Sequence, residues 1–167
     1  MVKTLRGCGA LRRRALLALA AALLAGCTGE GAQAVYVIRH FDTPEGVRDA
    51  ALTDRGHARA KALVRWFAGR PLGAVYATPF KRTRQTAASL LAERGLTATD
   101  YDWQQADALV AAVRARGGDV LIVGHSNTVP EIVERFGGTR PSPLTHPDFG
   151  DIWIIRDGRS ERMRVEP

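Results

Sequence analysis

The fold of this chain is constrained most by three short, mostly apolar runs, which lie at residues 35–38, 74–77 and 119–123. Runs of this length that are rich in Val and Ile suit strands buried on both faces, as the strands of parallel sheets are. The stretches between them have the spacing of amphipathic helices, and strands that alternate with helices indicate an α/β fold. We therefore predict a three-layer α/β sandwich with a mainly parallel central sheet flanked by helices.

Three helices are expected between these runs. They cover residues 54–67, 79–94 and 103–116. Thr53 has a side chain suited to the N-cap of the first helix. The pair Thr78-Pro79 has the pattern of an N-cap followed by proline at the first helical position of the second helix, and Gly95 ends that helix.

The end of the chain predicts two antiparallel strands, near residues 152–156 and 162–165. The segment between them, 157–161, is longer than the tightest Asp-Gly hairpin turn. We expect these strands at an edge of the sheet.

The first 26 residues do not belong to the folded domain. They contain five Lys and Arg residues and then an unbroken apolar run of eleven residues, 15–25. A transmembrane helix needs about 20 apolar residues, so this run predicts the hydrophobic region of a signal peptide. It ends in Leu24-Ala25-Gly26-Cys27, which resembles the lipobox of bacterial lipoproteins, where cleavage precedes the Cys and its thiol receives the lipid. Ordinary cleavage and a short membrane anchor are the alternatives.

The chain is thus expected to have three parts: a lipoprotein signal peptide (1–26), the lipidated Cys27 with a short tether (27–33), and a folded domain (34–167). Without the signal peptide, 19 Lys and Arg residues stand against 17 Asp and Glu residues. The sequence pI of 10.2 therefore mostly reflects the targeting segment, and we expect no nucleic-acid partner. The expected partners are the membrane, through the lipid on Cys27, and a substrate.

Cationic side chains follow the predicted strands where each strand ends. Arg39 and His40 follow the first strand, Arg82 lies just beyond the second, and His125 follows the third. In open α/β sheets, ligands bind beyond the carboxyl ends of the strands, so these side chains are expected to meet there. Arg82 falls in the first turn of its helix, where the helix dipole disfavours a cation by about 0.3–1 kcal/mol. A bound anion would remove this conflict, so the residues indicate a phosphate held by Arg39, Arg82 and His125, with His40 beside the phosphorus atom.

Four ordered motifs carry a family resemblance. They are "VIRHFDT", "LTDRGHARAKAL", "YATPFKRTRQTA" and "VLIVGHSNTVPEIV", which span about residues 34–136. Together they resemble the histidine phosphatase superfamily, whose members include the phosphoglycerate mutases.

The resemblance implies a mechanism and a set of roles. His40 corresponds to the nucleophile, which attacks phosphorus to give a phosphohistidine that water then hydrolyses. Arg39, Arg82 and a protonated His125 correspond to the groups that bind the phosphate and neutralise its charge. The implied reaction needs no metal ion and no cofactor.

The chain departs from the family pattern near the nucleophile and in its proton donor. Phe41 stands where the common motif has Gly, which is expected to alter the pocket wall. No residue is marked as the general acid by its spacing alone. Asp102, Asp42 and Asp49 are the three candidates.

Three functions are compatible with these residues. The leading one is a lipid-anchored phosphatase that acts on small phosphomonoesters in the cell envelope. In a Gram-negative cell we expect it in the outer membrane, facing the periplasm. Thr28 rather than Asp follows Cys27, which resembles the lipoproteins that are sorted there. The alternative is a catalytically weak lipoprotein that binds phosphate or a phosphometabolite on the same fold. A metal-dependent hydrolase using His40, Asp42 and His125 is less supported, because the neighbouring arginines would repel a divalent ion.

Other conspicuous residues are expected to be structural. His57 lies among basic residues on a predicted helix and should be exposed. His146 belongs to a proline-rich loop that is expected to be an ordinary connection, and a loop at the border of the pocket is the alternative. Trp66, Trp103 and Trp153 are expected to pack in the core or at its edge.

Overall fold

The computed structural model describes residues 32–146 and 148–167. The predictions for the signal peptide, the lipidated Cys27 and most of the tether fall on residues outside this range. The described residues form one compact unit, Ala32–Pro167, of strands and helices that alternate for most of its length. In chain order these are β1 (Val35–Arg39), α1 (Asp54–Trp66), β2 (Ala74–Ala77), α2 (Lys81–Arg94), β3 (Ala98–Asp100), α3 (Ala106–Arg116), β4 (Val120–Gly124), α4 (Val129–Arg135), β5 (Asp151–Arg156) and β6 (Arg159–Arg164).

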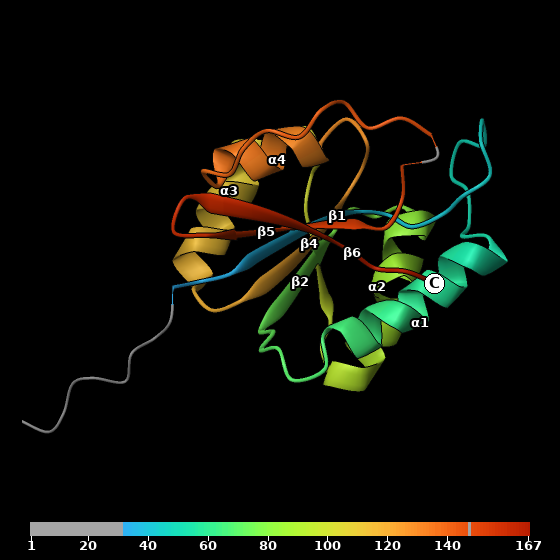
Figure 1. The fold of residues 1–167 in the computed structure, drawn as a ribbon, viewed down its shortest axis with the longest axis horizontal. Helices are drawn as coiled ribbons and strands as arrows, with labels where there is room; N and C mark the ends of the chain where they lie inside the picture. Colours follow the sequence, from blue (N-terminus) through green and yellow to red (C-terminus); the bar gives the residue numbers. More distant parts are fainter. Residues whose placement is uncertain (1–31, 147) are drawn as a thin grey trace, which may run out of the picture. The chain divides into compact units, whose positions relative to one another are not determined.

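The strands form one six-stranded sheet in the order β3-β2-β4-β1-β5-β6. The first four strands in this order run parallel, whereas β5 is antiparallel to β1 and β6 is antiparallel to β5. Figure 1 shows α1 and α2 together on one side of the sheet and α3 and α4 on the other. The predicted three-layer α/β sandwich with antiparallel strands near the C-terminus is confirmed.

The alternating side chains of β1 explain why both faces of the sheet are covered. Tyr36 and Ile38 belong to the apolar cluster that includes side chains of α1 and α2, whereas Val35 and Val37 belong to the cluster that includes side chains of α3 and α4. Successive residues of a strand point to opposite faces, so a strand that is apolar at every position needs a layer on each side. This burial places β1 in the middle of the sheet and its carboxyl end beside that of β4.

Two of the predicted helix ends are confirmed and one is wrong. Thr53 caps α1 by accepting a hydrogen bond from Gly56 N, and Gly95 ends α2 in the left-handed conformation with φ 62°. The Thr78-Pro79 pair does not cap α2, which begins at Lys81 after an N-cap at Phe80 that makes no side-chain capping bond. Thr78 is fully buried, and its hydroxyl has partners in the site described below.

Helix α3 begins later than expected, and two elements were not predicted. Residues before Ala106 form a turn in which Asp102 Oδ1 accepts a hydrogen bond from Gln104 N. Strand β3 is only three residues long, and α4 only seven, so neither has enough sequence to show a clear period. No helix among the described residues has the length and hydropathy needed to span a bilayer.

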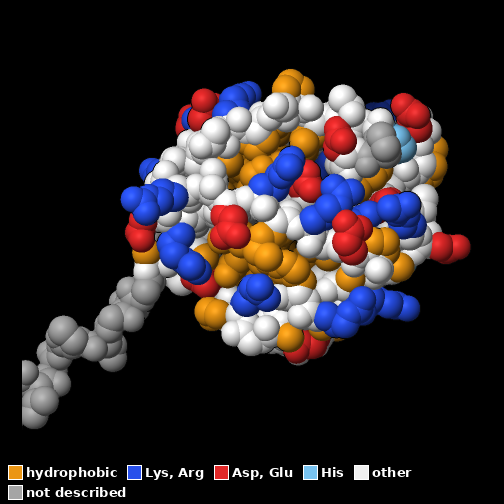
Figure 2. Space-filling view, viewed as in Figure 1, with side chains coloured by type: hydrophobic (Ala, Val, Ile, Leu, Met, Phe, Trp, Pro, Cys, Tyr) orange, Lys and Arg blue, Asp and Glu red, His pale blue; other side chains and the backbone are white. Residues whose placement is uncertain are grey.

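Strands β5 and β6 form a tighter hairpin than expected. Arg156 pairs with Arg159, which leaves only Asp157 and Gly158 in the turn, at φ 51° and 69°. Two positive φ values in a two-residue loop are typical of the type I′ turn that Asp-Gly favours, so the prediction of a longer connection is wrong. The predicted edge position is confirmed for β6, which reads RSERMR. Its charges protect the open edge from pairing with another strand, and Figure 2 shows Lys, Arg, Asp and Glu side chains intermixed over this view of the molecule.

Candidate active site

His40 and His125 lie side by side at the carboxyl ends of β1 and β4. Arg39 pairs with Gly124 in the parallel register, and the next backbone amide, His40 N, donates to Gly124 O at 2.9 Å. The two imidazole rings are 5.6 Å apart between centroids, and both residues are buried. The predicted meeting of these two histidines at one sheet edge is therefore present in the structure.

A cavity of about 220 Å³ opens over the two histidines. Its lining combines the two imidazoles with one guanidinium, two aromatic rings and two small polar side chains: His40, His125, Arg82, Phe80, Trp103, Ser126 and Asn127. The cavity has the cationic and hydrogen-bonding groups that a phosphoryl group needs, and none of its lining residues is acidic.

The hydrogen bonding of His40 leaves one ring nitrogen free to react. Nδ1 lies 2.9 Å from the carbonyl oxygen of Phe41, which can only accept, so Nδ1 carries the proton. Nε2 then holds a lone pair. Burial, with the positive charges of Arg39 and Arg82 and the neighbouring His125, lowers the pKa of His40 to about 3. The imidazole is neutral near pH 7 and has the electronic state of a nucleophile.

His125 is held by a chain of buried hydroxyl groups. Its Nε2 lies 2.9 Å from Thr78 Oγ1, which lies 3.1 Å from Thr83 Oγ1, and Thr83 donates to the carbonyl oxygen of Thr78 at 2.8 Å. The Nε atom of Arg82 can only donate, and it faces Nδ1 of His125 at 3.4 Å. The consistent assignment is therefore a proton on Nε2, donated to Thr78, and a lone pair on Nδ1.

The protonation of His125 depends on what binds beside it. Burial, with the positive charges of Arg82 and Arg39, lowers the pKa of His125 to about 4. A ring that faces two guanidinium groups is hard to charge, so His125 is neutral near pH 7 when no phosphate is bound, whereas the expected imidazolium refers to the phosphate-bound state and stays a prediction. A phosphate dianion beside Nδ1 would oppose this repulsion and raise the pKa.

Arg82 is the second residue of α2, as expected, and an internal carboxylate accompanies it. Asp49 Oδ1 accepts from the backbone N of Lys81 at 3.0 Å and lies 3.9 Å from Arg82 Nη1. Asp49 thus supplies a negative charge at the helix N-terminus, where the sequence indicated an anion. The guanidinium of Arg82 also lies over the Phe80 ring, 4.5 Å from its centroid.

Arg39 is adjacent to His40 but does not line the cavity. Its Nη1 donates to the carbonyl oxygens of Thr145 and Asp148 at 2.8 and 3.2 Å, and its guanidinium lies 4.2 Å from the centroid of Phe149. Among the described residues, the buried Nε of Arg39 has no hydrogen-bond partner. The structure therefore places Arg39 between the nucleophile and the loop of residues 141–149, with one donor atom unused.

The loop of residues 141–149 borders the site, although it was expected to be an ordinary connection. The Phe149 ring lies 5.9 Å from the His40 ring and 5.1 Å from the ring of His146. His146 Nε2 lies 3.1 Å from the carbonyl oxygen of Thr43, in the segment that follows β1. The loop thus packs against the residues around the nucleophile.

None of the three candidates for the general acid lines the cavity. Asp42 pairs with Arg59 at 2.8 Å and with Arg55 at 3.4 Å. Asp49 caps α2, and Asp102 lies in the wall of a neighbouring cavity. Because Asp42 pairs with two arginines, it is not available as the third metal ligand beside His40 and His125. Among the described residues, no group of three or more His, Cys, Asp or Glu side chains could hold a metal ion.

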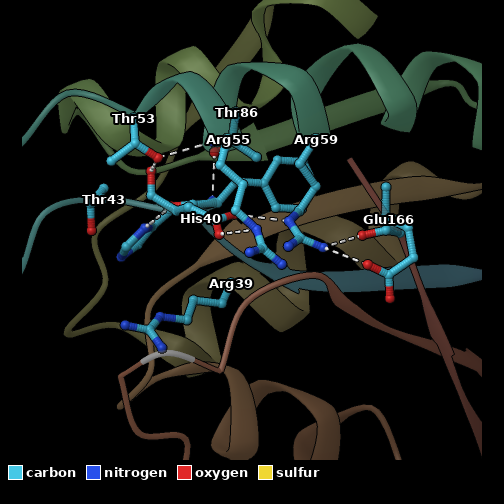
Figure 3. Close-up of polar contacts among 12 residues, drawn as sticks. Arg39, His40, Thr43, Thr53, Arg55, Arg59, Thr86 and Glu166 are labelled. Atoms are coloured by element: carbon cyan, nitrogen blue, oxygen red, sulfur yellow. Dashed lines mark hydrogen bonds and ion pairs between the residues drawn. The ribbon is translucent and has the colours of Figure 1, made fainter.

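The backbone after β1 is fixed from three directions. Phe41 N donates to Thr86 Oγ1 of α2 at 2.9 Å, and Thr53 N of the α1 cap donates to Asp42 O at 2.9 Å. Figure 3 shows Arg59, which is 1% exposed, between this segment and Glu166, the last residue but one. Arg59 Nη1 also donates to the carbonyl oxygen of Val165. These bonds hold His40 in place against α1, α2 and the end of the chain.

Two site features differ from the sequence-based view of them. Phe41 is fully buried in the apolar core and is absent from the cavity lining, so the expectation that it alters the pocket wall is wrong. Trp103 was expected to pack in the core or at its edge, but it is 40% exposed and lines the cavity.

His57 is exposed as predicted. Trp66 packs against Tyr36, and Trp153 is buried in the core, as predicted.

Comparisons with known proteins agree with this geometry. The model of the histidine phosphatase superfamily (branch 1) matches residues 35–103, a range that includes His40 and Arg82 and ends before His125. A search of curated proteins finds no match to the chain.

Several solved structures with the same fold are named as phosphatases. A protein histidine phosphatase SixA in complex with tungstate has 19% identity and a TM-score of 0.62, over 79% of this chain and 97% of that one. The alpha-ribazole phosphatase from Shigella flexneri has 15% identity and a TM-score of 0.62, over 80% and 96%. A phosphoserine phosphatase from Entamoeba histolytica has 13% identity and a TM-score of 0.60, over 81% and 97%. Identities this low show a shared fold. The family model over residues 35–103 and the fold of the described residues therefore agree, and both make this chain similar to the histidine phosphatase superfamily.

Proposed function

We propose that this protein hydrolyses phosphomonoesters without a metal ion, through a phosphohistidine formed on Nε2 of His40. The observation that carries the proposal is the hydrogen bond from His40 Nδ1 to the carbonyl oxygen of Phe41, because it leaves the Nε2 lone pair directed away from the backbone. The reaction supported by this arrangement has two steps that share one cavity.

In the first step, Nε2 of His40 attacks phosphorus while the bond from phosphorus to the leaving oxygen breaks. The imidazole gains positive charge as it attacks, and the Phe41 carbonyl oxygen stabilises the Nδ1 proton that it keeps. Arg82 and His125 face the cavity from the side of α2 and β4, where they can bind the non-bridging oxygens. In the second step, water attacks phosphorus, the N–P bond breaks, and His40 is restored with release of phosphate.

Arg39 supports the same chemistry from the opposite side. Its guanidinium is close enough to lower the pKa of both histidines, and its buried Nε has no partner among the described residues. An incoming phosphoryl oxygen would give this donor an acceptor and would bring Arg39 into the binding group, as the family resemblance implies.

Trapping the intermediate tests the proposal. Purified residues 28–167 are mixed with a ³²P-labelled phosphomonoester and quenched within milliseconds. The expected product is a labelled protein whose label is stable in alkali and lost in acid, as a phosphoramidate is, and whose label maps to His40. Turnover without any label on His40, together with inversion of configuration at a chiral phosphorus, would contradict the phosphohistidine mechanism, because two successive in-line displacements give retention.

The proposed location is the cell envelope, with the protein anchored by a lipid on Cys27. The support is the sequence alone: a basic region, an apolar run of eleven residues, and Leu-Ala-Gly-Cys at its end. Mass spectrometry of the protein extracted from membranes should find a diacylglyceryl group on Cys27. The Cys27→Ser variant should appear in the soluble fraction or remain unprocessed, and an unmodified Cys27 in the wild type would refute the anchor.

A second function is favoured by one observation. No acidic residue lines the cavity, so protonation of a poor leaving group has no donor in its wall. A protein of this kind would bind phosphometabolites and turn them over slowly. Tight phosphate binding together with single-turnover rates below those of product release for every phosphomonoester would favour this function.

A further inference from the structure

The cavity over the histidines shares a wall with a second cavity of about 340 Å³. Phe80 and Trp103 line both. Pro79, Tyr101, Asp100 and Asp102 complete the second one. The two cavities are therefore neighbours on either side of two aromatic side chains, and a ligand with its phosphoryl group at His40 would have Trp103 within reach of its other end.

Trp103 is unusual among the large hydrophobic side chains because it is exposed to solvent beside the candidate nucleophile. Only three large hydrophobic side chains are exposed among the described residues, namely Val47, Trp103 and Met163. Of these, only Trp103 lines a cavity that contains the candidate nucleophile. An exposed indole beside a reactive group is the surface that an apolar or aromatic ligand group covers.

Phe80 is fixed as the opposite part of this wall. Its ring meets the His125 ring edge-on, with 5.3 Å between centroids, and it carries the Arg82 guanidinium on its face. The ring cannot move away without breaking these contacts. These two contacts favour the observed position of the ring, which presents an aromatic surface to both cavities.

The charged side chains that line the second cavity are acidic. Its lining includes Asp100 and Asp102 and no Lys or Arg. Asp100 is paired with Arg84, which lies outside this lining. Asp102 accepts hydrogen bonds from Gln104 N and Gln105 Nε2, and no ion pair of Asp102 occurs among the described residues. A leaving group with a second phosphate or a carboxylate would face an uncompensated negative charge here.

We propose that the leaving group of the substrate binds between Trp103 and Phe80, and that it carries an aromatic ring and no negative charge. This inference rests on the proposed function, since it assigns the part of the phosphomonoester that departs from His40. It makes Trp103 and Asp102 specificity-determining residues: Trp103 stacks on the ring, and Asp102 excludes anionic groups and favours cationic ones.

The test uses three aryl phosphates whose phenols have matched pKa values and whose distal substituents are neutral, carboxylate or trimethylammonium. The measured quantity is kcat/KM for the wild type, Trp103→Ala, Asp102→Asn and the control Met163→Ala, which changes an exposed apolar side chain on β6. We expect the wild type to prefer the cationic and neutral esters to the carboxylate by about tenfold. Asp102→Asn should narrow this preference, and Trp103→Ala should raise KM for all three esters about tenfold more than it does for acetyl phosphate.

Two outcomes would overturn the inference. One is equal kcat/KM for the three charge types in the wild type, and the other is a Trp103→Ala effect no larger than that of Met163→Ala. Failure of the proposed function is detected separately, because binding needs no turnover. Calorimetry should show that phenylphosphonate binds the wild type more tightly than methylphosphonate does, and that Trp103→Ala removes the difference. Equal affinities of the two phosphonates for the wild type would overturn the inference even for an inactive protein.

Discussion

Thr78 Oγ1 lies 2.9 Å from Nε2 of His125, and the side chains of both residues are buried. Thr78 lies just beyond the carboxyl end of β2 and His125 just beyond that of β4, so the bond joins two neighbouring strands across the floor of the site. It fixes which nitrogen of His125 carries the proton and therefore which nitrogen faces the cavity.

Replacing Thr78 by Val should change the tautomer of His125. The variant keeps the shape of the side chain but leaves the buried Nε2–H without an acceptor, so the proton is free to move to Nδ1. We expect kcat/KM to fall about tenfold and the ¹⁵N shifts of the imidazole to show a mixture of tautomers. Thr78→Ser should restore both readouts, and Thr97→Val at an exposed position is the matched control. A wild-type spectrum with the proton on Nδ1 would contradict the assignment.

Replacing His40 by Ala should abolish the covalent step. With the nucleophile removed, turnover should fall by at least about 10³-fold, and no acid-labile phosphoprotein should form. His57→Ala is the matched control, because this histidine is exposed on α1 and takes no part in the site. Stopped-flow turnover and ³²P labelling of the two variants make the comparison. Retention of full activity by His40→Ala would exclude His40 as the nucleophile.

The two site histidines should remain neutral far below pH 7. Burial and neighbouring positive charge lower the pKa of His40 to about 3 and that of His125 to about 4, against about 6.5 in an unfolded chain. Between these values the unfolded state binds more protons, so the free energy of unfolding rises with pH and is lost as the pH falls from about 6.5 toward 4. Urea denaturation at several pH values should show this slope, and the His40→Asn/His125→Asn double variant should reduce it. NMR signals of imidazolium at both residues at pH 6 would contradict the prediction.

The rate of phosphoenzyme formation should depend steeply on the leaving group. No acidic side chain lines the cavity, so a departing oxygen leaves without a proton from its wall. We expect aryl phosphates and phosphoramidates to react well and alkyl phosphates poorly. The measurement is single-turnover kcat/KM across a graded series for the wild type, Asp42→Asn, Asp49→Asn and Asp102→Asn. A selective loss on alkyl phosphates in one variant would identify that residue as the acid, and a flat dependence in all four proteins would exclude the acid-free mechanism.

Replacing Asp42 by Asn should destabilise the protein more than it impairs chemistry. Arg59 is 1% exposed and pairs with Asp42 at 2.8 Å, so the variant leaves a buried guanidinium with only the exposed Glu166, at 3.7 Å, as a countercharge. The expected loss is about 3 kcal/mol in the free energy of unfolding, measured by urea denaturation. Asp54→Asn, at an exposed position one residue after the cap of α1, is the control. Unchanged stability in Asp42→Asn would show that the buried pair contributes nothing to the folded state.

The parts of the fold that the sequence predicted are those decided by local patterns. The apolar run of β1 and the N-cap at Thr53 each specify an element without reference to the rest of the chain. Because parallel strands place their carboxyl ends together, the meeting of His40 and His125 also followed from chain order alone. Strand β6 was harder to predict, since its charged side chains face solvent at the sheet edge and leave no apolar alternation to detect.

The parts that could not be predicted depend on contacts between distant residues. Thr78 before Pro79 has the local pattern of a helix cap, and only its distance from His125, 47 residues later, shows that its hydroxyl has another use. Tryptophan is usually a core residue, so the sequence favoured a buried position for Trp103. Only the structure shows that this side chain is exposed and lines the cavity. Phe41 was expected to alter the pocket wall because it stands where the family motif has Gly, whereas its side chain is buried in the apolar core.

The Arg59 bond to the Val165 carbonyl oxygen, and the pairing of β5 with β1, tie the nucleophile segment to the last residues of the chain. Synthesis proceeds from the N-terminus, so β1 and His40 emerge long before the partners that hold them. A nascent or truncated chain therefore lacks the support of its own reactive histidine until the C-terminal residues arrive. A deletion that removes Val165 and β5 is therefore expected to loosen the segment that carries His40, although the deleted residues lie more than a hundred positions away in the chain.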